Sequence, residues 1–266
     1  MKAVLEIRNL TVTAREGRRL LDDVSLCLNK GEIIGLTGES GCGKTTLIKS
    51  MMGFLRTEQL SLSGQILLDA RNITALPAKE HAALRGTTFA LIPQSPMTAF
   101  DPSWKIGAQM EETLRIKLHL SRKEAMERAE ESLSNVNLAD TKRILGSYPG
   151  QLSGGMLQRV AVALVFALEP EYILADEPTS ALDEENCDII TDLLLGSKKR
   201  AGVLLVSHDA RTLKRAADRL LVMHDGKIVD AGETDEVFTK PQNLHTIEFV
   251  RGAQRGKEDV WLWERS

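Results

Sequence analysis

The sequence has few cysteines, no surplus of positive charge and no long hydrophobic run, and each shortage argues against a class of protein. The three cysteines, Cys27, Cys42 and Cys187, lie far apart without CxxC spacing. We therefore expect neither a disulfide framework nor a zinc site, and a reducing cytoplasm fits best. The formal net charge of −3 disfavours a protein that binds nucleic acid. The longest apolar run, residues 160–168, is about half as long as a membrane-spanning helix, so the chain is not expected to be transmembrane.

Residues 38–45 (GESGCGKT) match the pattern GxxxxGK[ST], which cradles phosphate groups. The apolar residues 33–37 before it predict a buried strand, and residues 46–53 after it predict a helix that ends at a glycine. The glycines of the motif allow backbone N–H groups to turn inward on a phosphate, and the helix N-terminus adds partial positive charge. Lys44 would then reach the β- and γ-phosphates, and Thr45 would offer its hydroxyl to Mg²⁺.

The rest of the chain, which is long enough for one large domain or two closely joined lobes, alternates between predicted strands and helices. An antiparallel pair is expected near the N-terminus. After residue 172, strands separated by helical stretches predict parallel βαβ units. Between Pro93 and about Phe166 the pattern is helical, and Ser121 with Glu124 forms a capping box there. Strands are predicted at residues 4–13, 24–28, 63–69, 88–93, 172–175, 203–207 and 220–223.

Two carboxylates, Asp176 and Glu177, follow directly after the predicted strand at residues 172–175. Asp176 would hold Mg²⁺ or its waters, and Glu177 would polarise an attacking water. An acidic pair after a strand is common by chance. Together with the phosphate cradle, however, it predicts a site for a nucleotide and its magnesium ion.

The most specific stretch is residues 152–159 (LSGGMLQR), which resembles the LSGGQ signature of the ATP-binding cassette (ABC) family. The resemblance covers about residues 3–250 and implies an α/β fold of the P-loop NTPase type, the ABC nucleotide-binding domain. That fold has a RecA-like parallel-sheet core, an antiparallel β subdomain and an inserted α-helical subdomain. Ser153, Gly154 and Gly155 would open a helix and form a second anion site, suited to the γ-phosphate of ATP held by another subunit. The alternative is a helix that is merely capped by a serine.

Other motifs of the family are matched residue by residue. Gln94 is similar to the Q-loop residue that senses Mg²⁺ and the attacking water, and residues 180–183 (SALD) resemble the D-loop, which crosses the dimer interface. His208 resembles the switch histidine that contacts the γ-phosphate. One departure is the lack of an aromatic residue in residues 11–19, where the family often stacks the adenine. Arg15 or another side chain is expected to cover the base instead.

The resemblance implies a single cassette domain at residues 1–250, with the helical subdomain inserted at about residues 95–166. A short tail at residues 251–266, containing Trp261 and Trp263, would be disordered or docked. The chain is expected to hydrolyse ATP, with ATP and Mg²⁺ as cofactors. The predicted catalytic residues are Lys44, Gln94, Glu177 and His208, and the predicted Mg²⁺ ligands are Thr45, Gln94 and Asp176. The predicted nucleotide-binding residues are Gly38, Glu39, Ser40, Gly41, Cys42, Gly43, Lys44, Thr45, Thr46, Ser153, Gly154 and Gly155.

Residues 94–102 (QSPMTAFDP) resemble the Q-loop extension of one branch of the family, the peptide/nickel/opine importers, in which this segment normally touches the permease. Peptide-importing members commonly carry a longer C-terminal extension with a cysteine cluster. No cysteine follows Cys187 here, which favours uptake of nickel or a related chelated metal. The first alternative is the ATPase of a dipeptide or oligopeptide importer. The others are a soluble ABC ATPase that acts on nucleic acid and a nucleotide-binding regulator without hydrolysis.

The resemblance also implies a set of partners. These are integral-membrane permease subunits, a second ABC ATPase subunit that is the same chain or a paralogue, and an extracytoplasmic substrate-binding protein. Nucleic acid is not expected among them. The chain would lie peripherally on the cytoplasmic face of the inner membrane. The sequence decides neither the transported substrate nor whether the ATPase pair is homodimeric or heterodimeric.

Overall fold

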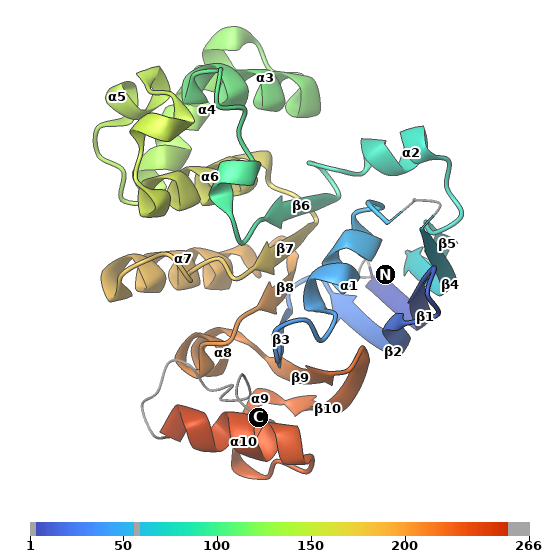
Figure 1. The fold of residues 1–266 in the computed structure, drawn as a ribbon. Coiled ribbons are helices and arrows are strands. Elements are labelled where there is room, and N and C mark those ends of the chain that lie inside the picture. The colour runs from blue at the N-terminus through green and yellow to red at the C-terminus, as the bar shows by residue number, and fades with distance from the viewer. Residues whose placement is uncertain (1–3, 56–58, 255–266) are drawn as a thin grey trace.

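The computed structural model describes residues 4–55 and 59–254, and two β-sheets form its framework (Figure 1). One sheet is antiparallel with the order β2-β1-β4-β5, and the other has six strands in the order β10-β9-β3-β8-β7-β6. The strands are β1 (Val4–Ala14), β2 (Arg19–Asn29), β3 (Ile33–Gly38), β4 (Leu60–Leu68), β5 (Arg71–Asn72), β6 (Phe89–Ile92), β7 (Tyr172–Asp176), β8 (Gly202–Val206), β9 (Arg219–His224) and β10 (Lys227–Glu233). The helices are α1 (Lys44–Met51), α2 (Ala78–Ala83), α3 (Ile106–Leu118), α4 (Arg122–Asn135), α5 (Thr141–Gly146), α6 (Gly154–Leu168), α7 (Glu184–Ser197), α8 (Ala210–Ala216), α9 (Thr234–Thr239) and α10 (Leu244–Gln254).

The six-stranded sheet is parallel except at one edge. Strand β3 pairs in parallel with β8 and β9, β7 pairs in parallel with β8 and β6, and only β10 runs antiparallel to its neighbour β9. Successive residues on β3 and β7 enter opposite cores: Ile33 and Ile173 pack on one face, and Ile34 and Leu174 on the other. Because both faces are buried, these strands are apolar throughout rather than alternating with polar residues.

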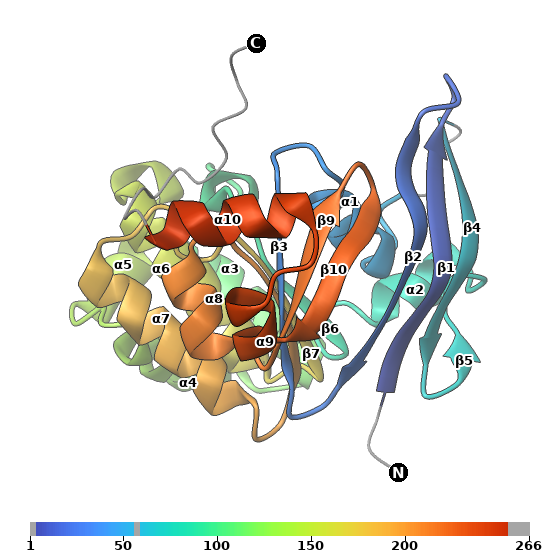
Figure 2. The same cartoon turned by 90° about the horizontal axis from the view of Figure 1, so that it is seen from below.

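The antiparallel sheet lies beside one face of the six-stranded sheet, with α1 between the two sheets (Figure 2). Leu47, Ile48 and Met51 of α1 are almost completely buried there among side chains of β1, β2 and β3. Burial on this scale is worth about 2 kcal/mol or more for each large aliphatic side chain. The helix that follows the phosphate motif is therefore held from both sides, which fixes the position of the motif.

Helices α3 to α6 form a lobe at the other end of the molecule from the antiparallel sheet (Figure 1). The predicted capping box at the start of α4 is confirmed: the Ser121 hydroxyl accepts a hydrogen bond from the Glu124 backbone N–H at 3.3 Å, and the Glu124 carboxylate accepts one from the Ser121 N–H at 2.8 Å. Met110, Leu114 and Leu133 are fully buried between the helices. The buried side chains of the lobe thus belong to the same core as those on one face of the six-stranded sheet.

Three parts of the chain differ from the sequence-based expectation or lie beyond it. The helical pattern was expected from Pro93 onward, but after a short 3₁₀ turn at Pro96–Thr98 the first α-helix begins only at Ile106. Prolines and the side chain of Asp101, which accepts hydrogen bonds from the Ser103 N–H and hydroxyl, impose turns instead. Strand β10 and helix α10 were not predicted. The predicted tail lies outside the described residues from residue 255 onward, and no described helix is long and apolar enough to span a bilayer.

Candidate nucleotide site

The loop between β3 and α1 needs its glycines for steric reasons. Gly38, Gly41 and Gly43 have φ angles of 149°, 79° and 114°, a region that other residues rarely adopt. A Cβ atom on Gly38 would lie 2.1 Å from the Met223 carbonyl oxygen, and one on Gly43 would lie 2.7 Å from the Leu20 carbonyl oxygen. The loop can therefore follow this path only with hydrogen at those positions, and it leads directly into the N-terminus of α1.

Lys44, the first residue of α1, folds its side chain back over the loop. Its Nζ donates to the carbonyl oxygens of Gly38 and Glu39, both at 2.7 Å, and lies 3.8 Å from the Cys42 Sγ. Burial raises the pKa of the Cys42 thiol, so this neighbour stays neutral. The ammonium group is thus held at the mouth of the loop, beside the N-terminus of the helix, where an anion would be attracted by both.

The predicted magnesium ligands Thr45 and Asp176 come together. The Thr45 hydroxyl donates to the Asp176 Oδ2 at 3.0 Å, which joins the start of α1 to the end of β7. Burial raises the pKa of Asp176, the Thr45 hydrogen bond opposes this effect, and the neighbouring charge of Glu177 adds to it. A hydroxyl and a partly desolvated carboxylate are oxygen donors of the kind that Mg²⁺ prefers, and a cation would relieve the burial of the carboxylate charge. The residues present therefore fit a magnesium ion.

Glu177 and His208 form a second contact at the same edge of the sheet. Glu177 has a φ of 51°, an uncommon backbone conformation for a residue with a side chain, and its N–H donates to the Val206 carbonyl oxygen of β8 at 3.0 Å. The Glu177 Oε2 lies 2.8 Å from the Nδ1 of His208, which follows β8. The carboxylate is almost buried, whereas the imidazole is partly exposed. The bend after β7 thus aims a carboxylate at a histidine on the neighbouring strand.

The signature segment lies on the helical lobe, at the beginning of α6. The Ser153 hydroxyl accepts a hydrogen bond from the Met156 N–H at 3.2 Å, so the serine is an N-cap, and Ser153 and Gly154 are exposed to solvent. A Cβ atom on Gly155 would lie 3.2 Å from the Ala181 carbonyl oxygen, which places the segment against the predicted D-loop. The exposed N–H groups at the start of this long helix can receive an anion from outside the chain.

Comparisons with known proteins bear on this arrangement. Residues 21–180 match the family model described as "ABC transporter". The chain belongs to the ABC transporter family. It is 37% identical, over 91% of its length and 90% of the relative's, to the metal-staphylopine import system ATP-binding protein CntD of Staphylococcus aureus. It is 36% identical to the oligopeptide transport ATP-binding protein OppD of Lactococcus lactis, covering 97% of this chain and 79% of that one.

Solved structures show the same fold. The dimeric bacterial ABC transporter cassette MJ0796 superimposes with a TM-score of 0.78 at 28% identity, covering 86% of this chain and 98% of that one. The expected fold class is therefore confirmed: the chain has the ABC nucleotide-binding domain fold with its mixed α/β sheets. The chain is also 38% identical to the probable D,D-dipeptide transport ATP-binding protein DdpD of Escherichia coli, covering 88% of this chain and 72% of that one.

Most of the predicted side chains of this ABC protein gather at one edge of the sheet. This edge is formed by the carboxyl ends of the adjacent strands β3, β8 and β7. Asp176 is the last residue of β7, and the segments that follow the three strands carry Lys44, Thr45, Glu177 and His208. The expected Q-loop residue follows β6 at the outer edge of the same sheet and is exposed, and the signature serine contacts its own helix. The hairpin between β1 and β2, where an aromatic residue is missing, carries an exposed arginine at position 15. Its role toward a base stays a prediction.

Sequence reasoning included Gln158 of α6 in the signature but gave its side chain no role. Its side chain is 1% exposed, and its Nε2 donates to the carbonyl oxygens of Pro93 at 3.3 Å and Pro178 at 3.2 Å. One residue therefore ties the signature helix to the residue before Gln94 and to the residue after Glu177. The signal was available: a glutamine placed between apolar residues on the inner face of a helix must find hydrogen-bond partners there.

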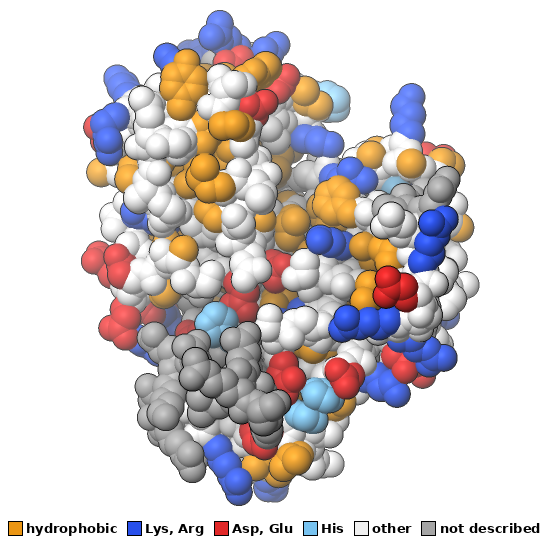
Figure 3. Space-filling model, in the orientation of Figure 1, with side chains coloured by type: hydrophobic (Ala, Val, Ile, Leu, Met, Phe, Trp, Pro, Cys, Tyr) orange, Lys and Arg blue, Asp and Glu red, His pale blue; other side chains and the backbone are white. Residues whose placement is uncertain are grey.

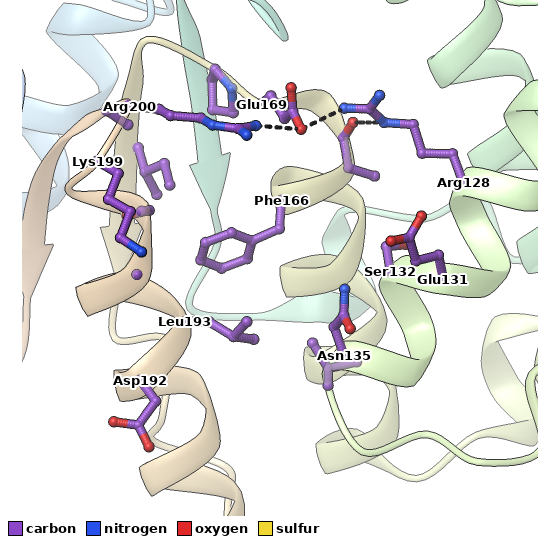
Figure 4. Close-up of a pocket in the computed structure, with 17 residues that line it drawn as sticks. Arg128, Glu131, Ser132, Asn135, Phe166, Glu169, Asp192, Leu193, Lys199 and Arg200 are labelled. Atoms are coloured by element: carbon purple, nitrogen blue, oxygen red, sulfur yellow. Dashed lines mark hydrogen bonds and ion pairs between the residues drawn. The ribbon is translucent and has the colours of Figure 1, made fainter.

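A cavity of about 440 Å³ lies away from these motifs, between α4 and the C-terminal ends of α6 and α7 (Figure 4). Arg128 and Arg200 both reach Glu169 across its rim, at 3.2 Å and 2.8 Å. The signature lies at the opposite end of α6, a separation of about 20 Å along a helix of this length. The residues that line the cavity include none of the predicted site residues.

Proposed function

We propose that the chain binds and hydrolyses ATP and drives the uptake of a small substrate through a membrane permease. The observation that carries the first part is the convergence of Lys44, the Thr45–Asp176 pair and the Glu177–His208 pair beside a glycine loop. A phosphate chain on the loop would receive backbone N–H groups and the Lys44 ammonium. Such fixed positive groups, aimed at the oxygens of a transferred phosphoryl group, supply much of the catalysis in phosphoryl transfer.

In this proposal each remaining side chain has one task. Thr45 and Asp176 would hold the magnesium ion, which neutralises the charge that develops on the phosphates. Glu177 would accept a proton from the attacking water, and the contact with His208 would keep its carboxylate in place. Gln94, exposed at the edge of the sheet, would approach the ion and the water only when a nucleotide and a second cassette are present.

The second half of the site would come from another cassette, the same chain or a paralogue. Ser153 and Gly154 are exposed at the N-terminus of a helix and contact no other predicted catalytic residue among the described interactions. A helix N-terminus attracts phosphate, and this one has no lysine or strand loop of its own. In a closed pair, the signature of one subunit would face the γ-phosphate held by the other.

Two observations support a role in uptake: the similarity to ATP-binding proteins of import systems and an exposed apolar surface. Met97 and Trp104, in the segment after Gln94, are large apolar side chains with 51% and 49% of their surface exposed. In the view of Figure 3, hydrophobic side chains are exposed over the helical lobe and across the notch from it. Such a patch fits a protein partner, and we assign it to a permease subunit. The chain would then lie on the cytoplasmic face of the inner membrane, in a system that includes an extracytoplasmic substrate-binding protein.

For the substrate we propose nickel or a related chelated transition metal. Support comes from the similarity to an ATP-binding protein of a metal-staphylopine import system. A dipeptide or oligopeptide is the second candidate, favoured by nearly equal identity to OppD and DdpD. In this proposal the transported molecule binds to other subunits of the system.

Uptake of labelled nickel and of a labelled dipeptide, in host cells that carry the chain or its Lys44→Ala variant, tests the proposal. We expect nickel uptake to require Lys44 and dipeptide uptake to be unaffected. Loss of dipeptide uptake alone would replace the metal by a peptide and keep the transport function. If neither changes although the protein is expressed and no second ATPase substitutes for it, both substrates are wrong. Purification from detergent-solubilised membranes should also recover a multispanning partner, which a soluble ATPase or regulator would lack.

A further inference from the structure

A second group of metal-ligating side chains lies beside the phosphate loop, on the side away from the magnesium ligands. It consists of Glu39 in the loop itself, His224 at the end of β9 and His245 near the start of α10. One ligand atom from each residue lies within 4.8 Å of the other two. Residues far apart in the sequence are thus brought together by the packing of α10 beside β9 (Figure 2).

One nitrogen atom of each imidazole lies near the same carboxylate oxygen. The Nδ1 atoms of His224 and His245 lie 3.7 Å and 3.6 Å from the Glu39 Oε1. The two rings are stacked, with centroids 3.6 Å apart and planes at 18°. Because a metal lies close to the plane of each imidazole that binds it, one ring would have to turn out of the stack for both to bind the same ion. Among the described residues neither Nδ1 has a hydrogen-bond partner, although both atoms are buried from solvent. Buried polar atoms of folded proteins nearly always have a hydrogen-bond partner or a ligand, so an ion bound by both nitrogens and the carboxylate would satisfy them.

The distances suit a transition metal. Nitrogen and oxygen ligands at about 2.0–2.2 Å from a tetrahedral zinc ion are separated from each other by roughly 3.4 Å. The observed separations of the two Nδ1 atoms from the Glu39 Oε1 are close to that value, and rotation of one imidazole out of the stack would direct both nitrogens at one ion. Asp225 lies near the other nitrogen of His224, with its Oδ2 3.6 Å from the Nε2. A small movement of this exposed carboxylate would let it accept a hydrogen bond from Nε2 while Nδ1 binds the ion.

We propose that Glu39, His224 and His245 bind a divalent transition-metal ion, with a water molecule completing the coordination. Two imidazoles and one carboxylate select Zn²⁺, Ni²⁺, Co²⁺ or Cu²⁺ over Mg²⁺, which prefers oxygen ligands. The ion would tie the phosphate loop to α10. The Glu39 carbonyl oxygen also accepts a hydrogen bond from Lys44, so the restraint acts next to the ATP-binding lysine. The proposal is independent of the transported substrate and of ATP hydrolysis.

The test is binding of Zn²⁺ to the untagged protein, measured without nucleotide by competition with a chromophoric chelator. We expect one site, an affinity at least about tenfold weaker in His245→Phe and in His224→Ala, and no competition by millimolar Mg²⁺. The phenylalanine variant keeps a stacked ring, so its loss of affinity reports the missing nitrogen rather than lost packing. His119→Asn, at an exposed helix end where φ is 55°, removes a histidine elsewhere and should bind Zn²⁺ like the wild type.

A second readout is thermal unfolding. At Zn²⁺ concentrations about 100-fold above Kd, the Tm of the wild type and of His119→Asn should rise by about 5 °C, and the Tm of His245→Phe should not. Equal Zn²⁺ affinity in the wild type and His245→Phe would overturn the proposal, as would an equal loss of affinity in all three variants. Because neither readout involves turnover, failure here leaves the proposed ATPase function standing, and an inactive ATPase leaves this site standing.

Discussion

The phosphate loop and the signature segment are both helix N-termini with glycines, yet they are built differently. At the loop, Lys44 donates to the Gly38 carbonyl oxygen and Thr45 to Asp176, and backbone atoms close to Gly38 and Gly43 leave no room for a Cβ. At the signature, Ser153 caps its own helix, and Gly154 has open space around it. The difference indicates that the first site is organised in one chain, whereas the second is presented for a partner to complete.

The largest expected effect is the loss of ATP turnover when Glu177, beside the phosphate loop, is substituted. Glu177→Gln keeps the size of the side chain but removes the basic oxygen, so we expect ATP turnover to fall by ~10³-fold, within the range for loss of a general base. ATP affinity should be kept, because the loop and Lys44 are unchanged. Steady-state hydrolysis and nucleotide binding by calorimetry measure the two effects. Normal turnover by this variant would remove Glu177 from the role of the base and leave the acid pair as a structural feature.

Ser153→Ala tests whether the signature acts in another subunit. Loss of a hydroxyl that donates to a transferred phosphate should lower turnover by ~10²-fold, while the ATP affinity of the monomer stays the same. The substitution also removes an N-cap, which costs about 1 kcal/mol of stability. Ser121→Ala is the matched control, because it removes the N-cap serine of α4 and touches no predicted site. Both variants should lose similar stability in urea unfolding. A similar turnover in both would mean that Ser153 is a cap and nothing more.

Gln158 connects the signature helix to Pro93 and to Pro178, which follows Glu177, so its substitution tests how much this connection contributes to stability. In Gln158→Met the carbonyl oxygens of Pro93 and Pro178 lose their shared donor inside the protein, which should lower the free energy of unfolding by about 1–3 kcal/mol. The exposed Gln65 offers a control, since Gln65→Met should change stability by less than about 0.5 kcal/mol. Urea unfolding of the two variants makes the measurement. Equal stability would show that the bridge carries no net free energy.

The sequence predicted the strands and the loop well because the physics there is local. The apolar residues of β3, β7 and β8 are buried on both faces, which gives continuous hydrophobic runs, and the glycine pattern can serve few purposes other than a phosphate turn. The capping box of α4 depends on two residues three positions apart, and it formed as expected. Thr45 and Asp176, both predicted from the sequence as Mg²⁺ ligands, meet because β7 ends at the same edge of the sheet as the loop after β3.

The remaining features depend on contacts between distant segments. Nothing near His245 in the sequence shows that α10 returns to the phosphate loop, so its meeting with Glu39 and His224 could not be foreseen. The helical pattern after Pro93 was misleading because its polar residues make turns around Asp101 rather than a helix. Gln158 was read as part of a motif, and only the structure shows what it bridges. Tertiary contacts, not local preference, decided each of these.

The smallest expected effect is on stability and concerns Asp176, a buried carboxylate beside the phosphate loop. The signature segment has no such group among its residues 152–159. Because burial raises the pKa of Asp176 above its unfolded value, the folded chain holds this proton more tightly. The contribution to stability is therefore fully present below the unfolded pKa and is lost as the pH rises through the folded pKa. Asp176→Asn stays neutral and can still accept the Thr45 hydrogen bond, so without Mg²⁺ it should be more stable than the wild type at neutral pH.

The difference between the wild type and Asp176→Asn isolates this one group, since every other carboxylate is common to both. Urea unfolding midpoints, measured from acid to neutral pH in the presence of a chelator, should diverge in favour of the variant as the pH rises. Added Mg²⁺ with nucleotide should reverse the order, because the ion stabilises the charged carboxylate and the amide binds it poorly. Parallel midpoints at every pH would mean that the Thr45 hydroxyl alone compensates for the burial, and the loop would then need no cation to balance its charge.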